Sequence, residues 1–167
     1  MKKFLAFFLF LLLLTLTTGC QFVEKVNVRK EMVTYIDSMN KIIDQLAVEE
    51  RSYKEDYVEE EENDEAFTYI EEQYIPAYEQ AIKEIKAIPI ETEEMQEIRT
   101  LIVQAYQLNI QAVKTDKEAY ETGDKELTLK YDEIETKMEE LYARHDDEMK
   151  RLGEEYGVEI TFEEERG

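Results

Sequence analysis

The single histidine of this 167-residue chain, His145, is followed by the acidic run 146–148, a grouping of side chains that could bind a metal ion. A helical di-iron centre requires a Glu-x-x-His pair from each of two helices, because each iron takes an imidazole as well as carboxylates. Here the residue three positions before His145 is Tyr142, and no second histidine exists. A di-iron site is therefore excluded, and we expect His145 to lie at the end of a helical bundle beside a neighbouring acid.

Other catalytic groups are also scarce. The chain has only one histidine and one cysteine that could take part in nucleophilic catalysis. Among 41 acidic residues some pair always falls at the spacing of a glycosidase, so carboxylate spacing carries no information. The sequence has no Gly-rich phosphate loop and no EF-hand spacing around residues 115–124, and the acidic run 59–65 is typical of a solvated turn. We expect no catalytic residues, no metal and no cofactor, and hence no enzyme.

The only cysteine, Cys20, directly follows a hydrophobic leader. Two lysines at positions 2–3 precede an almost unbroken apolar run over residues 4–16, the pattern of a secretory signal peptide. As a helix this run would be about 20 Å long, short of the roughly 30 Å hydrocarbon core of a bilayer. A cleaved signal peptide over residues 1–19 is therefore favoured, with an uncleaved span extended to Cys20 as the alternative.

The residues just before Cys20 are Thr17, Thr18 and Gly19, and this segment resembles the lipobox of bacterial lipoproteins. In that family the cysteine thiol receives a diacylglyceryl group, and cleavage makes the cysteine the first residue. The family prefers Leu three residues before the cysteine, where this chain has Thr17. The resemblance implies lipid attachment at Cys20, with the lipid bilayer as partner and the extracytoplasmic face of the bacterial cell membrane as location. An ordinary secreted protein with a free thiol is the alternative.

The chain is strongly acidic, with a net charge of −21 at pH 7. Cleavage after Gly19 would leave 148 residues, in which 18 basic and 41 acidic residues give a net charge of −23. Such a charge excludes nucleic acid as a partner, because that binding requires Lys and Arg against phosphates. Three cations close to Cys20 are the local exception: Lys25, Arg29 and Lys30. We expect these membrane-proximal basic residues to face lipid headgroups while the acidic body points outward.

Apolar residues recur every three or four positions, which predicts four amphipathic helical segments. In the first segment the expected buried stripe is Met32, Ile36, Met39, Ile43, Leu46, Tyr53 and Tyr57. The second segment is expected to kink or break near Pro76, and its stripe is Phe67, Ile70, Tyr74, Ala77, Ala81, Ile85 and Ile88. Pro89 ends this segment, Thr92 and Gly123 bound the third, and Asp124 caps the fourth.

Four such segments joined by short turns bury their stripes most simply in an antiparallel up-and-down bundle of three to four long helices. The expected fold class is therefore all-α, with a three-helix bundle whose second arm is broken as the close alternative. We expect a short tether over residues 20–27, a helical bundle domain over 28–157 and an acidic C-terminal tail over 158–167. No Gly, Ser or Pro-rich spacer follows Cys20, so the body is expected close to the membrane.

The chain has eleven tyrosines and no tryptophan. Several tyrosines fall on the apolar stripes, but four fall beside them and could form an exposed row that stacks on sugar or peptide: Tyr69, Tyr78, Tyr106 and Tyr142. Architecture and composition are also similar to those of small helical cell-wall-binding lipoproteins of Gram-positive bacteria, with no motif to carry over. That resemblance implies a non-enzymatic interaction module for cell-wall polymer or a basic protein. A sensor or chaperone-like domain for cations or cationic peptides is the alternative.

Overall fold

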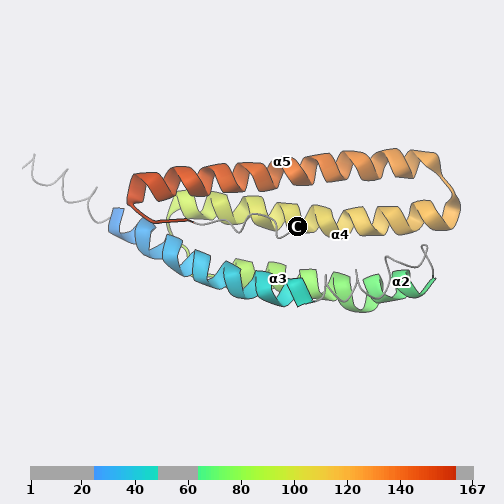
Figure 1. The fold of residues 1–167 in the computed structure, drawn as a ribbon, viewed down its shortest axis with the longest axis horizontal. Coiled ribbons are helices and arrows are strands. Elements are labelled where there is room, and N and C mark those ends of the chain that lie inside the picture. The colour runs from blue at the N-terminus through green and yellow to red at the C-terminus, as the bar shows by residue number, and fades with distance from the viewer. Residues whose placement is uncertain (1–24, 49–63, 161–167) are drawn as a thin grey trace, which may run out of the picture.

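The computed structural model describes residues 25–48 and 64–160, and all regular secondary structure in these ranges is helical. Residues 25–48 form the N-terminal helix. The other elements are α2 (Asp64–Tyr69), the π-helix η1 (Ile70–Tyr74), α3 (Ile75–Ala87), α4 (Glu93–Thr122) and α5 (Lys125–Tyr156). α4 and α5 form a long antiparallel hairpin, and Figure 1 shows the N-terminal helix and the α2–α3 arm along one side of it. The predicted all-α helical bundle is confirmed.

One hydrophobic core joins the N-terminal helix, α3, α4 and α5. From the N-terminal helix it takes residues separated alternately by four and three positions: Val28, Met32, Tyr35, Met39, Ile42 and Leu46. The prediction that Ile36 and Ile43 lie on this stripe was wrong. Their neighbours Tyr35 and Ile42 occupy the core instead, while Ile43 is 49% exposed. Tyr53 and Tyr57 lie outside the described residues.

The second helical arm changes its hydrogen-bonding register just before Pro76. Proline has no backbone N–H, and its ring crowds the carbonyl four residues earlier, here that of Glu72. The Ile75 N–H bonds to the carbonyl of Ile70, five residues back, within η1. The predicted interruption near Pro76 therefore takes the form of a π-helical segment between α2 and α3.

This π-helical segment adds a residue to one turn and so moves the buried stripe. An uninterrupted α-helical rhythm predicted Tyr74 and Ala77 as core residues, but both are only partly buried. Beyond Ile70 the buried positions are Ile75, Tyr78, Ala81, Ile82 and Ile85. Upstream, Phe67 packs with Ile70 and Ile75 in a smaller cluster against Ile110 and Val113 of α4.

The predicted helix ends agree with the structure. α3 stops at Ala87, two residues before Pro89. α4 is closed by Gly123, whose left-handed backbone has a φ of 67°, a conformation that favours glycine. Asp124 caps α5, since its Oδ1 accepts the backbone N–H of Glu126 at 2.9 Å. These local signals place the two described connections, between α3 and α4 and between α4 and α5, where the sequence predicts them.

Beyond α5 the chain folds back onto the core. The N–H of Val158 bonds to the carbonyl of Gly153 at 2.9 Å, and Val158 and Ile160 pack partly buried against the core. A Cβ atom added at Gly153 would lie 2.8 Å from the Val158 carbonyl oxygen. The first residues of the predicted tail are therefore docked, and the approach requires glycine at position 153; residues 161–167 lie outside the described part.

Candidate functional site

The three cations predicted to be membrane-proximal lie on the first described turns of the N-terminal helix. Lys25, Arg29 and Lys30 are all exposed, and Val26 among them is 51% exposed. Residues four positions apart share a helix face, so Lys25 lies above Arg29 and Val26 above Lys30. Cys20, the predicted lipid attachment residue, lies outside the described residues. Within the described ranges no helix has both the length and the apolar character needed to cross a bilayer.

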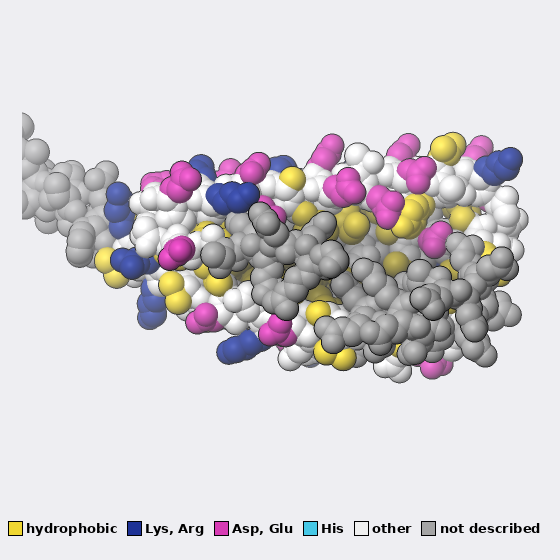
Figure 2. Space-filling view, in the orientation of Figure 1, with side chains coloured by type: hydrophobic (Ala, Val, Ile, Leu, Met, Phe, Trp, Pro, Cys, Tyr) yellow, Lys and Arg dark blue, Asp and Glu magenta, His cyan; other side chains and the backbone are white. Residues whose placement is uncertain are grey.

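The N-terminal helix differs in net charge from the other long helices. The N-terminal helix carries four basic and three acidic residues over 25–48, a net charge of +1. α4 carries three basic and six acidic residues, a net charge of −3, and α5 carries six and eleven, a net charge of −5. Figure 2 shows dark blue side chains around the start of the N-terminal helix and magenta ones along α5. Charge is therefore distributed unevenly among the helices.

Two side chains hold this end of the bundle to the connection between α3 and α4. The Glu31 carboxylate accepts the N–H groups of Glu91 at 3.2 Å and Thr92 at 3.1 Å. Thr92 stands at the predicted N-cap of α4, but its hydroxyl donates to Glu31 at 2.6 Å instead of capping its own helix. Arg99 donates to the carbonyl of Ile88 at 2.9 Å, which satisfies a free acceptor at the end of α3.

Tyr35, His145 and Asp146 form a hydrogen-bonded chain between the N-terminal helix and α5. The Tyr35 hydroxyl lies 2.9 Å from His145 Nε2, and His145 Nδ1 lies 2.9 Å from Asp146 Oδ1. Burial raises the pKa of the Tyr35 hydroxyl well above its usual value, so this hydroxyl stays protonated. The Asp146 carboxylate can only accept, so we assign the histidine proton to Nδ1, and Nε2 of the neutral ring then accepts from the Tyr35 hydroxyl.

This chain has residue types found in catalytic triads, but its hydroxyl is not an activated nucleophile. Tyr35 is 1% exposed, and a raised pKa is the opposite of what activation requires. The prediction that His145 is satisfied by a neighbouring acid is confirmed. The arrangement therefore links two helices, and its tyrosine hydroxyl is enclosed by the core.

The four tyrosines considered as an exposed row lie differently. Tyr78 and Tyr106 are buried, at 4% and 5% exposed, so these two do not belong to an exposed row. Their rings form a ladder across the bundle: Tyr74 and Tyr78 are 4.7 Å apart between centroids, Tyr78 and Tyr106 5.2 Å, and Tyr106 and Tyr142 6.4 Å. Tyr69 and Tyr142 are half-buried. Aromatic packing accounts for Tyr74, Tyr78, Tyr106 and Tyr142.

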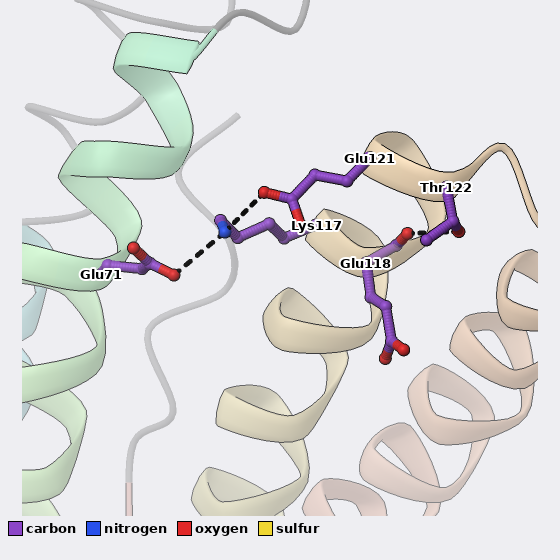
Figure 3. Close-up of polar contacts among 5 residues, drawn as sticks. All are labelled: Glu71, Lys117, Glu118, Glu121 and Thr122. Carbon is purple, nitrogen blue, oxygen red and sulfur yellow. Dashed lines mark hydrogen bonds and ion pairs between the residues drawn. The ribbon is translucent and has the colours of Figure 1, made fainter.

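A cavity of about 300 Å³ lies between η1, the start of α3, and α4. Four apolar and four charged residues line it: Ile70, Ile75, Pro76, Val113, Glu71, Glu79, Lys114 and Lys117. Lys117 Nζ lies 2.7 Å from Glu121 Oε1 and 3.1 Å from Glu71 Oε1, so it bridges α4 and η1 (Figure 3). These hydrogen bonds, first to Glu121 and then to Glu71, raise the pKa of Lys117. The cavity therefore combines an apolar lining with a lysine that two carboxylates hold in place.

A wider hollow of about 540 Å³ lies between the first turns of α4 and the last turns of α5. The α4 side presents carboxylates, namely Glu93, Glu94 and Glu97. On the α5 side, Arg151 is paired with Glu148 at 2.8 Å and with Glu155 at 3.1 Å. This groove is more acidic than basic, and neither it nor the cavity was predicted, because each requires knowledge of which helices are neighbours.

Within the described ranges, no group of three or more His, Cys, Asp or Glu side chains is arranged to hold a metal ion. Comparisons of the chain with protein-family models, with curated proteins and with solved structures find no match. Any functional assignment for this chain therefore depends on its own residues: the basic end of the N-terminal helix, the two hollows and the acidic surface of the hairpin.

Proposed function

We propose that this protein is a lipid-anchored lipoprotein on the extracytoplasmic face of the bacterial cell membrane, acting as a non-enzymatic interaction module. The observation that carries the proposal is the position of Lys25, Arg29 and Lys30, exposed on one end of an otherwise acidic bundle. They follow a cysteine that the leader pattern marks for acylation. Anchor and cations would therefore act at the same end of the molecule.

The energetics favour this orientation. Two acyl chains give stable anchoring at about 0.8 kcal/mol per buried methylene, whereas one chain gives marginal binding. Each Lys or Arg near an anionic headgroup surface adds roughly 1 kcal/mol. Only four residues separate Cys20 from Lys25, so the cations lie within reach of the headgroups whenever the anchor is inserted. The negative charge of α5 is repelled by the same surface and directs the hairpin outward.

The outward surface is suited to a partner that is basic or rich in hydroxyl groups, such as a basic protein or cell-wall polymer. The acidic groove between the first turns of α4 and the last turns of α5 lies at the same end of the bundle as the basic residues, so it would receive a partner close to the membrane (Figure 1). Co-sedimentation of the protein with purified cell wall would support the polymer as partner. Capture of basic but not acidic proteins, weakening as salt rises, would support a protein partner.

Intact-mass measurement of protein extracted from membranes tests the anchor directly. The expected mass corresponds to loss of residues 1–19 and addition of acyl groups at Cys20, and Cys20→Ala should release the protein or leave its leader uncut. Unmodified full-length chain in the cytosol would overturn the proposal.

The basic end is tested separately by its charge. Replacing Lys25 and Lys30 with Glu should weaken binding to vesicles containing phosphatidylglycerol. The same replacements at Lys125 and Lys130, exposed residues at the start of α5, change the net charge equally and serve as the control. Equal loss of binding in both pairs would show that total charge, rather than the basic end, governs attachment.

A second function, as a sensor or chaperone-like domain for cationic peptides, is favoured by the groove carboxylates Glu93, Glu94 and Glu97. A ligand that binds only the folded state raises the melting temperature, and the rise grows with the logarithm of the ligand concentration once this exceeds Kd. A lysine-rich peptide should therefore raise the melting temperature of the wild type and leave that of a Glu94→Gln, Glu97→Gln variant unchanged. An identical rise in both would exclude the groove as the binding site.

A further inference from the structure

The N-terminal helix has a second apolar stripe beside the core stripe, of which Ile36, at the edge, packs against the core while the other residues are exposed. Val26, Val33 and Ile43 are 51%, 47% and 49% exposed, and Ile36 is only partly buried. Val26 and Val33 are seven residues apart, as are Ile36 and Ile43, and the two pairs are offset by three positions. This is the spacing of the a and d positions of a heptad repeat. The N-terminal helix therefore has two apolar stripes, one in the core and one mostly exposed.

The outer stripe is distinct from the core stripe through Val28, Met32 and Tyr35. At 3.6 residues per turn, its centre lies about a third of a turn around the helix from the core stripe. In the outer register the a positions are Val26, Val33, Asn40 and Ala47, and the d positions are Arg29, Ile36 and Ile43. The core side chains Met32, Met39 and Leu46 fall at the g positions. The helix can therefore pack against the bundle and against another helix at the same time.

We propose that the occupant of this outer stripe is the same helix of a second copy of the chain, in parallel orientation. Asn40 at a central a position is the first argument, since a single polar residue among the a positions specifies register and oligomer state. Asn40 is exposed in the single chain. In a parallel, in-register pair it meets its own counterpart, whose amide both donates and accepts hydrogen bonds. β-Branched residues at the other a positions, Val26 and Val33, favour two strands as well.

Charge supplies the second argument. A chain of net charge −21 repels a copy of itself over most of its surface. The N-terminal helix, at +1, is the exception among the long helices, because α4 and α5 carry −3 and −5. Parallel pairing gathers Lys25, Arg29 and Lys30 of both copies at one end of the seam. These cations repel each other, so pairing should strengthen as salt screens them.

The first test measures the mass of the full chain in detergent micelles by sedimentation or light scattering. The protein mass should be twice that of one chain, and the dimer fraction should rise with salt. A combined Val33→Asp, Ile43→Asp variant should be monomeric, with a melting temperature near that of the wild type because both side chains lie outside the core. Leu129→Asp, at a residue of α5 that is 65% exposed, is the matched control and should remain dimeric. A monomeric wild type, or a dimer that survives both aspartates, would overturn the proposal.

Orientation is tested by disulfide formation, which does not depend on whether the aspartate variants fold. Val33→Cys should form a disulfide with its counterpart under mild oxidation, because a positions meet across a parallel in-register seam. The unsubstituted chain controls for Cys20, and Leu129→Cys controls for random collision. An antiparallel pair would hold the two positions 33 apart, so failure of Val33→Cys to cross-link above these controls would refute the parallel arrangement.

Discussion

Replacing Tyr35 with Phe tests the hydrogen-bonded chain that joins the N-terminal helix to α5. The ring keeps its place in the core, where Tyr35 is 1% exposed, so the change removes one hydroxyl and little volume. His145 Nε2 loses its only described donor, 2.9 Å away, and is left as an unsatisfied acceptor in a partly buried position. The expected result is a lower free energy of unfolding.

The size of this loss follows from leaving a buried acceptor unpaired, which costs about 1–3 kcal/mol. For a chain of this length each kcal/mol corresponds to about 2–4 °C in melting temperature, so the expected fall is roughly 2–12 °C. Tyr120→Phe, at a residue that is 44% exposed, is the control and should change stability by less than about 0.5 kcal/mol.

Urea unfolding of Tyr35→Phe, His145→Phe and the double variant measures the coupling directly. The double variant should lose less stability than the sum of the two single losses, by about 0.5–3 kcal/mol, as expected for side chains in contact. Alkaline pH provides an independent measurement. The unfolded state loses the Tyr35 proton above its ordinary pKa of 10.0, while burial makes the folded state retain it. This contribution to stability is present below pH 10 and declines as pH rises further.

Tyr35→Phe should therefore lose less stability between pH 8 and about pH 11 than the wild type does. Additive single variants together with an unchanged alkaline slope would refute the assignment of Tyr35 as a buried donor to His145.

Three further changes test other contacts. Gly153→Ala should lower the melting temperature despite the better helix propensity of alanine, because its Cβ would lie 2.8 Å from the Val158 carbonyl oxygen. A higher melting temperature would show that residues 158–160 can move away from α5 at little cost. Glu31→Gln removes one acceptor oxygen and the charge that Thr92 and its neighbour bond to, so chemical denaturation should show a loss of about 1–3 kcal/mol. Ile85→Ala, at a fully buried residue, should cost about 2–5 kcal/mol by calorimetry, and a smaller loss would mean that the core closes around the cavity.

The turns of the bundle could be predicted because their signals are local. Pro89 disfavours a helical backbone at the residue before it, and Gly123 adopts a left-handed backbone that is unfavourable for other residues. Asp124 has a side chain short enough to accept an N–H two residues later. Each of these effects acts within a few positions, so no knowledge of the neighbouring helices is needed.

The buried face of the N-terminal helix could not be fixed in the same way. Tyr35 and Ile42 lie seven residues apart, and so do Ile36 and Ile43. The two pairs begin three and four residues after Met32, so either can share a helix face with it. Hydrophobic spacing identifies an amphipathic helix but cannot rank two apolar stripes on it. Only packing against α4 and α5 decides which one is buried.

The candidate site was predicted in part for the same reason. The cations at 25–30 follow from their sequence distance to Cys20, and exposure on one helix end agrees with that prediction. Glu31 was missed because its partners lie sixty residues further along the chain. The cavity beside η1 was missed because it depends on the extra residue that the π-helical turn inserts before Pro76.

The bond between Glu31 and the start of α4 bears on how the bundle responds to mechanical tension. The N-terminal helix runs lengthwise along the molecule (Figure 1), so a pull on its first residues acts nearly parallel to its axis. Under such a pull, the helix can detach only if its whole apolar face slides along the bundle at once, rather than separating turn by turn. Glu31 adds hydrogen bonds to the start of α4 near the point where the force enters, so the bundle should resist tension applied to the first turns of this helix.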